Sequence, residues 1–281
     1  MKVDKFLILG SSGLIGKYLK EYLEKRGKEV IEFDIKNHFS QDLRIASNYE
    51  LEKHLLNSDF VFFLAFDVGG AKYLNNLDNN EKFLSNNTAI LLNTFNALSK
   101  NRKPFIFAST YLVDNLENNY SLLKRLGESF TSSLSGINVR FWNIYGFETV
   151  SDRSHLIPDL IHQCVVNRNI KLLTDGNEKK QFLYVEDCCE CLFEIALRFH
   201  RLNKLKYIDL SSFDWISVYD VGRIISELFN CPISHSKIQS NLAPIVEPLN
   251  TVLSFWEPKT SLLDGIIKIK RIYEESNYNR S

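Results

Sequence analysis

Tyr120 and Lys124 are the pair of residues in this 281-residue sequence best suited to acid–base chemistry. Their i, i+4 spacing puts both side chains on one face of a helix. A lysine ammonium beside a phenol favours the phenolate, so we expect Lys124 to lower the pKa of Tyr120 from its usual value of about 10. Such a tyrosine can move a proton to or from a substrate oxygen, and Thr110, at the end of an expected strand, can donate a hydrogen bond to the same oxygen. We therefore predict these three residues as catalytic.

A glycine-rich turn near the N-terminus predicts a cofactor. The segment Gly10–Gly16 has the spacing G-x-x-G-x-x-G, between an apolar strand and a helix. Glycines there permit a tight turn and close approach to a pyrophosphate, while the helix N-terminus offers N–H donors to the anion. Asp34 ends the next strand, where a carboxylate accepts hydrogen bonds from ribose hydroxyls and repels a 2′-phosphate. The sequence thus predicts NAD, bound through Gly10, Ser12, Gly13, Leu14, Ile15, Gly16, Asp34 and Ile35.

Apolar runs and amphipathic stretches alternate through the first half of the chain. The expected strands are Lys5–Leu9, Val30–Phe33, Phe60–Leu64, Phe105–Ala108 and Val139–Trp142. The expected helices are Leu14–Arg26, Ile45–Leu56, Glu81–Ser99 and Tyr120–Leu134. Runs that are apolar on both faces and joined through helices indicate a parallel sheet covered on both sides. The predicted fold class is α/β, a doubly wound Rossmann sheet.

After about residue 146 the alternation loosens, and five of the six prolines occur there. We expect residues 1–150 to form the NAD-binding domain and residues 151–281 a smaller substrate-binding lobe, interleaved with the end of the sheet. Thirty-four basic residues balance thirty-four acidic ones, which gives no electrostatic argument for binding nucleic acid or an anionic membrane. No apolar run is long enough to span a bilayer and no signal-peptide pattern occurs, so we expect a cytoplasmic protein.

The five cysteines, three of them in the cluster Cys188-Cys189-Glu190-Cys191, raise the question of a metal site. The cluster lies in an expected helix, Glu186–His200, and no Cys-x-x-Cys pair lies elsewhere. Metal-binding cysteines usually occur in several such pairs, so we predict no metal. Reduced and partly buried thiols are the expectation for a cytosolic chain.

Several motifs, in order along nearly the whole chain, resemble those of the extended short-chain dehydrogenases, specifically the nucleotide-sugar epimerase/dehydratase family. Besides the glycine turn and Tyr120-x-x-x-Lys124, they are Asp42-Leu43, Leu64-Ala65-Phe66, Ser109-Thr110, Arg140–Gly146, Phe182–Asp187 and Trp256–Leu262. The resemblance implies that Lys124 reaches the nicotinamide ribose beside Tyr120. It also implies cofactor contacts from Asp42, Leu43, Leu64, Ala65, Phe66, Phe141 and Ile144.

A nucleotide-sugar substrate follows from the same resemblance, held by Val68, Gly69, Thr110, Asn143, His155, Leu156 and Lys180. Lys180 stands where the family usually has an arginine for the pyrophosphate, and a lysine lacks the bidentate fork of a guanidinium. For His155, a surface position at a helix start is an equal alternative. Asp67-Val68-Gly69-Gly70 resembles a segment of enzymes acting on GDP-mannose derivatives; its glycines would let a sugar approach the backbone, or form a flexible loop. This segment favours a GDP-sugar.

The residue after Thr110 bears on the reaction. Related 4,6-dehydratases have an acid there, whereas Tyr111-Leu112 follow here, and no cysteine lies near this point for 3,5-epimerisation. We expect hydride exchange at the sugar C4 by a 4-epimerase or 4-dehydrogenase, with a nucleotide-4-keto-sugar reductase as the alternative. A different class, a non-catalytic NAD-binding sensor, is disfavoured because such proteins tend to lose the tyrosine or lysine. Relatives often dimerise through two helices, here Glu81–Ser99 and Tyr120–Leu134, which predicts a homodimer.

Overall fold

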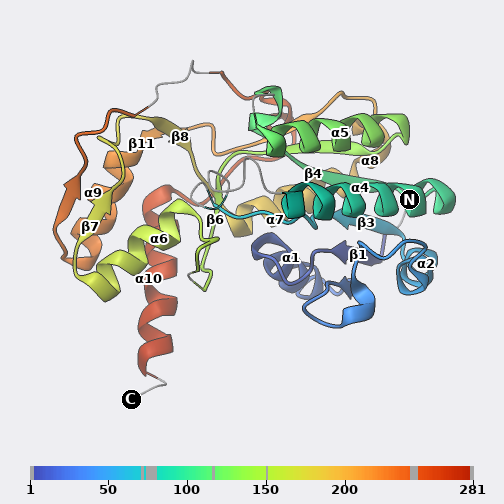
Figure 1. Cartoon of the computed structure of the whole chain (residues 1–281), viewed down its shortest axis with the longest axis horizontal. Coiled ribbons are helices and arrows are strands. Elements are labelled where there is room, and N and C mark those ends of the chain that lie inside the picture. The colour runs from blue at the N-terminus through green and yellow to red at the C-terminus, as the bar shows by residue number, and fades with distance from the viewer. Residues whose placement is uncertain are drawn as a thin grey trace.

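A six-stranded parallel sheet forms the centre of the molecule (Figure 1). The computed structural model describes residues 3–70, 73, 81–115, 118–149, 151–240 and 246–278. The sheet has the order β10-β5-β4-β3-β1-β2, and its strands are β1 (Lys5–Leu9), β2 (Glu29–Phe33), β3 (Phe60–Phe63), β4 (Phe105–Thr110), β5 (Ile137–Phe141) and β10 (Ile208–Leu210). The chain runs outward from β1 to β2 and then returns to β3, so the order reverses between β1 and β3. The predicted doubly wound fold is confirmed, and folds of this type bind their ligands at such a reversal.

Helices cover both faces of the sheet (Figure 1). One face carries α1 (Leu14–Glu24) and α7 (Val185–Leu197), and the other carries α2 (Tyr49–Leu56), α4 (Glu81–Asn101) and α5 (Asn119–Ser133). The side chains of β1 contribute alternately to the hydrophobic cores on the two faces of the sheet, because successive side chains of a strand point to opposite faces. Phe6 and Ile8 lie in the core on the α1 side, while Leu7 and Leu9 lie in the core on the α4 side. This division explains why the run Phe6–Leu9 is apolar on both faces.

Local capping explains where the helices depart from the expected bounds. The helix expected from Ile45 begins at Tyr49, because the Asn48 side chain accepts a hydrogen bond from the Leu51 amide at 3.1 Å and caps α2. Asn118 caps α5 in the same way through the Ser121 amide, at 2.8 Å. The cap places Tyr120 in the first turn of α5.

The second half of the chain builds a lobe beside the sheet, at the left of Figure 1. Its helices are α6 (Leu156–His162), α9 (Val218–Phe229) and α10 (Leu262–Tyr278), and its strands pair as β8 (Lys179–Gln181) with β11 (Trp215–Ser217) and β7 (Ile170–Leu172) with β12 (Ile233–His235). The short pair β6 (Ile144–Tyr145) and β9 (Leu183–Tyr184) joins the lobe to the end of β5. Two segments of this half, α7 and β10, return to the Rossmann layers.

The expectation of reduced thiols is wrong for two of the five cysteines. Cys164 and Cys231 form a disulfide in the lobe, with their Cα atoms 5.9 Å apart. The parallel pairing of β7 with β12 brings the segments before these strands together, which places the two thiols side by side. The remaining three are buried on α7, where burial raises the pKa of each thiol. Within the described ranges, no cluster of His, Cys, Asp and Glu is arranged to hold a metal ion.

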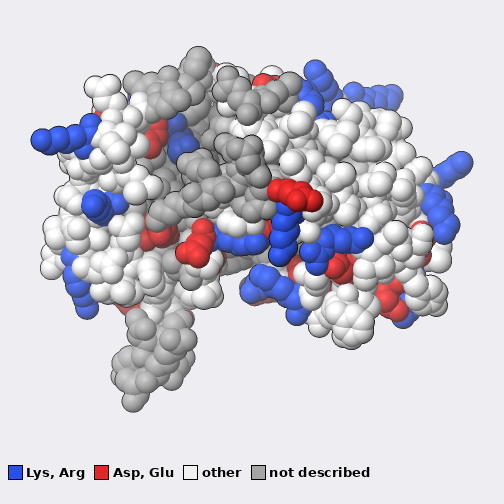
Figure 2. All heavy atoms as spheres, viewed as in Figure 1, with Lys and Arg blue, Asp and Glu red and all other residues white. Residues whose placement is uncertain are grey.

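Charge is mixed over the surface. Figure 2 shows basic and acidic side chains interspersed on the viewed face, in keeping with the equal numbers of each in the sequence. None of the helices in the described part of the chain is both long and apolar enough to cross a bilayer.

Candidate active site

The glycine turn lies at the carboxyl end of β1, at the reversal of strand order. Gly10 has a φ of +92°, and Gly13 precedes α1 without any side-chain cap. The first N–H groups of α1 are therefore available to an anion, as a pyrophosphate requires. The Asp34 carboxylate lies beside this turn and accepts from the Ser12 amide at 3.0 Å and the Lys36 amide at 2.9 Å. The residues present fit the adenosine and pyrophosphate portions of a dinucleotide.

Asp42 and Leu43 follow on the same edge of the sheet. Leu43 is buried, whereas the Asp42 carboxylate is held by the guanidinium of Arg44, with Nε at 2.9 Å from one oxygen and a terminal nitrogen at 2.8 Å from the other. The Arg44 hydrogen bonds keep the pKa of Asp42 below its usual value despite partial burial. The predicted adenine contact by this pair remains a prediction, and Ile35 is half exposed beside it.

The three predicted catalytic residues meet at the carboxyl end of β4. Thr110 is the last residue of β4, and its hydroxyl hydrogen-bonds the Tyr120 phenol. Lys124 follows one helical turn later, and its Nζ donates to the Ala108 carbonyl at 2.6 Å. Phe66, from the strand-end segment that also holds Leu64 and Ala65, lies beside both: the centre of its ring is 3.9 Å from the Lys124 Nζ and 5.9 Å from the centre of the Tyr120 ring.

The expected lowering of the Tyr120 pKa is not found in this arrangement. Burial raises the pKa of Tyr120 to about 12, although the Thr110 hydrogen bond acts in the opposite direction. Burial also lowers the pKa of Lys124 to about 7, against the charge of Glu128. The physical reason is the apolar setting, because aromatic rings and a strand carbonyl replace water around the ammonium and reduce its charged fraction. At neutral pH the phenol is therefore protonated, and Lys124 is divided between its two forms.

Two of the predicted substrate residues come together at the start of the lobe. Asn143 has a left-handed φ of 40°, and its side-chain amide donates to the Gln181 carbonyl at 3.0 Å. This bond places Asn143 beside β8, where Lys180 precedes Gln181. In the described part of the chain, the Lys180 ammonium has no carboxylate partner. Phe141 and Ile144 flank Asn143 at the ends of β5 and β6.

His155 stands at the N-cap of α6, directly before Leu156. The Glu148 carboxylate accepts from the His155 amide at 2.6 Å and lies 3.1 Å from its Nδ1. This carboxylate orients the imidazole, with its second oxygen 3.2 Å from the same nitrogen. Sequence reasoning did not single out Glu148, since a glutamate after Gly146-Phe147 carries no signal without knowledge of where the chain turns.

The glycines after β3 serve a purpose other than the expected approach of a sugar. A Cβ on Gly69 would lie 2.9 Å from the Cβ of Arg153, and one on Gly70 would lie 2.1 Å from the Ser154 carbonyl oxygen. Residues 153 and 154 of the lobe therefore lie directly against the backbone of the Val68–Gly70 segment. A sugar contact at Gly69 stays a prediction.

A polar chain that the sequence did not reveal runs across this contact. Asp67 accepts from the Arg153 guanidinium at 2.7 Å and from the Asn86 side chain at 3.0 Å. Asn86 in turn accepts from Arg44 at 3.0 Å. A continuous series of hydrogen bonds thus runs from Arg44, beside Asp42, to Arg153 in the lobe. Its members lie far apart in the sequence.

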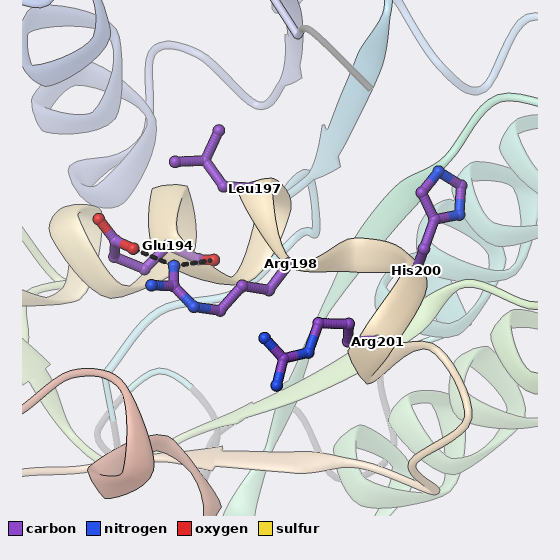
Figure 3. A pocket seen from close by; sticks show the side chains of 5 residues that line it. All are labelled: Glu194, Leu197, Arg198, His200 and Arg201. Atoms are coloured by element: carbon purple, nitrogen blue, oxygen red, sulfur yellow. Dashed lines mark hydrogen bonds and ion pairs between the residues drawn. The ribbon is translucent and has the colours of Figure 1, made fainter.

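A surface hollow of about 420 Å³ lies elsewhere, between α7 and α8 (Phe199–Leu202) (Figure 3). Its lining is Glu194, Leu197, Arg198, His200 and Arg201. The Phe199 ring lies 5.5 Å from the ring of Phe60, the first residue of β3. The hollow is therefore at the amino edge of the parallel sheet, opposite the crevice that holds the candidate catalytic residues.

The chain is similar to known proteins over most of its length. The model of the NAD dependent epimerase/dehydratase family matches residues 6–207. UDP-glucuronic acid decarboxylase 1 of Arabidopsis thaliana is 23% identical over 306 residues, covering 93% of this chain and 68% of the relative.

Solved structures share the fold across the chain. An epimerase from Methanothermobacter thermautotrophicus is similar with a TM-score of 0.83 at 21% identity, covering 98% of this chain and 93% of the other. A GDP-6-OMe-4-keto-L-xylo-heptose reductase from C. jejuni is similar with a TM-score of 0.83 at 16% identity, covering 98% and 99%. At these identities the likeness is one of fold.

Proposed function

Because the chain belongs to the NAD dependent epimerase/dehydratase family, we propose that it exchanges a hydride between NAD(H) and C4 of a nucleotide sugar, as a 4-epimerase or 4-dehydrogenase. The observation that carries the proposal is the Thr110–Tyr120 hydrogen bond beside Lys124, at the same sheet edge as the glycine turn. A proton-transfer group and a dinucleotide site thus face one crevice, as carbinol–ketone exchange requires.

The chain's own residues account for the proton movements. In the reductive direction the Tyr120 phenol gives its proton to the ketone oxygen, and in the oxidative direction the Tyr120 phenolate takes the proton of the sugar hydroxyl. Thr110 donates to the same oxygen and fixes its position. Lys124, held near the phenol, supplies a positive charge that stabilises the phenolate when one forms. Bound NAD(H) accepts or supplies the hydride.

The surroundings of Thr110 support exchange at one carbon over loss of water. Tyr111 follows it, and the Tyr111 ring stacks on Trp142 with centroids 4.6 Å apart. The first carboxylate after this point, Asp114, is paired with Arg140 and Arg125. No acid of this turn is therefore free to remove a second proton from the sugar, within residues 111–115.

A nucleotide-4-keto-sugar reductase is the second candidate. A phenol whose pKa is raised to about 12 remains protonated at neutral pH, which is the form that donates a proton to a ketone. The similar C. jejuni protein is described as such a reductase of a GDP-linked sugar, which also supports the GDP-sugar preference. Asn143, Lys180 and His155 are the proposed contacts for the nucleotide diphosphate and sugar.

The test is product analysis by mass spectrometry and NMR with a panel of GDP-, UDP- and dTDP-sugars and their 4-keto forms. Each is run without cofactor and with NAD(H) or NADP(H). Epimerisation yields an isomer without net cofactor turnover, whereas the other activities convert cofactor stoichiometrically. We expect NAD(H) to be preferred, because Asp34 lies where a 2′-phosphate would sit. Loss of carbon dioxide or water from any sugar contradicts the proposal, and binding of NAD without any turnover identifies a sensor.

We also propose a cytoplasmic homodimer, assembled through α4 and α5. These helices pack together through Phe95 and Phe130, whose rings stack at 5.1 Å. The large apolar side chains of α4 are mostly buried in the core, but Leu92, Leu122 and Leu126 remain about half exposed. Apolar side chains on a shared outer face favour association. We expect light scattering to give twice the chain mass of 32.6 kDa, and a monomer would contradict the assignment.

A further inference from the structure

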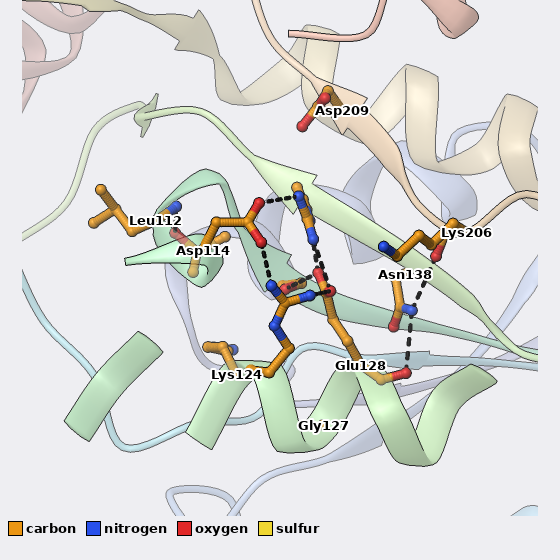
Figure 4. Close-up of polar contacts among 12 residues, drawn as sticks. Leu112, Asp114, Lys124, Gly127, Glu128, Asn138, Lys206 and Asp209 are labelled. Carbon is orange, nitrogen blue, oxygen red and sulfur yellow. Dashed lines mark hydrogen bonds and ion pairs between the residues drawn. The ribbon is translucent and has the colours of Figure 1, made fainter. Parts of the chain in front are cut away.

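A buried ionic network lies beside the catalytic residues (Figure 4). Arg140, on β5, and Glu128, on α5, have side chains only 4% and 6% exposed. The Arg140 guanidinium donates to both Glu128 oxygens, at 2.7 and 2.9 Å, and the Ser109 hydroxyl donates to one of them at 2.7 Å. Three elements of the Rossmann domain, β4, β5 and α5, are thus joined through one carboxylate.

The network extends to the turn that follows Thr110. This turn is the 3-10 helix η2 (Tyr111–Asp114), which Thr110 caps by accepting from the Leu112 amide at 3.3 Å. The third guanidinium nitrogen of Arg140 donates to Asp114 at 2.9 Å, and Arg125 on α5 also pairs with Asp114. In contrast to its partners, Asp114 has a side chain 61% exposed. Its carboxylate fastens η2 to both β5 and α5.

We propose that the Asp114–Arg140–Glu128 network is a positioning device that sets Thr110 against Tyr120. Thr110 and Tyr120 belong to different elements, yet their hydroxyls must share one substrate oxygen. The network lies four residues beyond Thr110 along η2 and eight beyond Tyr120 along α5. It therefore fixes the separation of the two elements that carry the pair. The catalytic part of this inference rests on the proposed function, whereas the structural part does not.

The charges around Arg140 show why the network is held in one arrangement. Its guanidinium lies 3.6 Å from the centre of the Tyr207 ring, and the charge of Asp209 on β10 also acts on it. An arginine enclosed in this way needs its carboxylates, because a buried guanidinium left without a partner is strongly unfavourable. Planar bidentate pairing also restricts orientation more than a point charge does. Glu128 has a further role, since its charge opposes the effect of burial on the pKa of Lys124 one turn away.

The test uses Asp114→Asn, chosen because exposure of Asp114 allows the variant to fold while Glu128 still pairs Arg140. Asp114→Glu restores the carboxylate and serves as the rescue. The matched control is Arg223→Gln, which removes exposed ion pairs on α9. Two readouts are taken: hydrogen exchange of peptides over β4, η2 and the first turns of α5, and kcat and KM on the best nucleotide sugar, with NAD(H) affinity measured separately.

We expect Asp114→Asn to speed exchange in those peptides about tenfold and leave other regions unchanged. We expect kcat to fall about tenfold, with KM and NAD(H) affinity within twofold of the original, because orientation rather than binding is lost. Asp114→Glu should recover most of both effects, and Arg223→Gln should show neither. Unchanged local exchange overturns the proposal, as does faster exchange with unchanged kcat. If no sugar is turned over, the proposed function fails while local exchange still decides whether the network holds the two elements together.

Discussion

Tyr120→Phe is expected to lower kcat by about a thousandfold while NAD(H) still binds, because removing a proton-transfer group typically costs 10²- to 10⁴-fold. The substitution removes one oxygen from a side chain in the first turn of α5 and leaves the ring against Phe66. The Thr110 hydroxyl loses this partner but still accepts from the Leu112 amide at 3.3 Å. The fold and the glycine turn are therefore unaffected.

Turnover is measured on the substrate identified by the panel, and NADH binding by fluorescence titration. Tyr22→Phe on α1 is the matched control, since it deletes a phenolic oxygen away from the crevice; its kcat should match the original protein. Unchanged turnover in Tyr120→Phe would contradict the catalytic assignment. Equal losses of turnover and NADH affinity would assign the hydroxyl to cofactor binding instead.

The second large effect is expected from alanine substitutions in the glycine turn, which separate folding from cofactor binding. A Cβ on Gly16 would lie 2.2 Å from the Gly10 carbonyl oxygen and 2.8 Å from the Ser11 Cα. These are backbone atoms of the turn itself, so β1 and α1 must move apart. We expect Gly16→Ala to cost about 3 kcal/mol, the upper part of the range for overpacking. For a chain of this size the unfolding midpoint should fall by roughly 6–10 °C.

Gly13→Ala is the paired variant. Its φ is −73°, and its added Cβ would lie 3.4 Å from the Gly10 oxygen, an ordinary contact. The protein alone should therefore keep its unfolding midpoint. The methyl group occupies the place where the backbone approaches a pyrophosphate, so NAD affinity should fall at least about tenfold. Calorimetry of unfolding and of NAD binding gives both quantities. A wild-type midpoint for Gly16→Ala, or wild-type affinity for Gly13→Ala, would contradict this division of roles.

The sequence was sufficient for the parts of the fold that depend on local pattern. Lys5–Leu9 is observed with the expected bounds, because an apolar run ended by a glycine turn has little freedom in where it stops. The expected strands Phe60–Leu64 and Phe105–Ala108 differ from β3 and β4 by one or two residues at an end, where hydrogen bonding to neighbouring strands decides. The glycine turn, Tyr120 and Lys124 could be recognised because their spacing alone carries meaning.

Contacts between residues that are far apart in the sequence could not be predicted from local pattern. Arg140 was recognised as part of a motif, but its ligands Glu128 and Asp114 become neighbours only after β5 and α5 pack together. Gly69 and Gly70 suggested room for a ligand, yet the lobe fills that room. The lowering of the Tyr120 pKa was argued from the charge of Lys124, whereas the burial of both groups has the larger effect. Burial is a tertiary property that the spacing of two residues does not report.

The late position of α7 and β10 in the sequence has a consequence for the newly synthesised chain. β10 completes the sheet next to β5, and the ring of Phe193 on α7 lies 5.9 Å from that of Phe6 in β1. Contacts between residues so far apart in sequence form slowly and leave apolar surface uncovered until they close. The face of β1 that α7 covers therefore stays open while much of the lobe is still being translated. The core beneath α7, although β1 is encoded first, is among the last parts of the sheet to be covered.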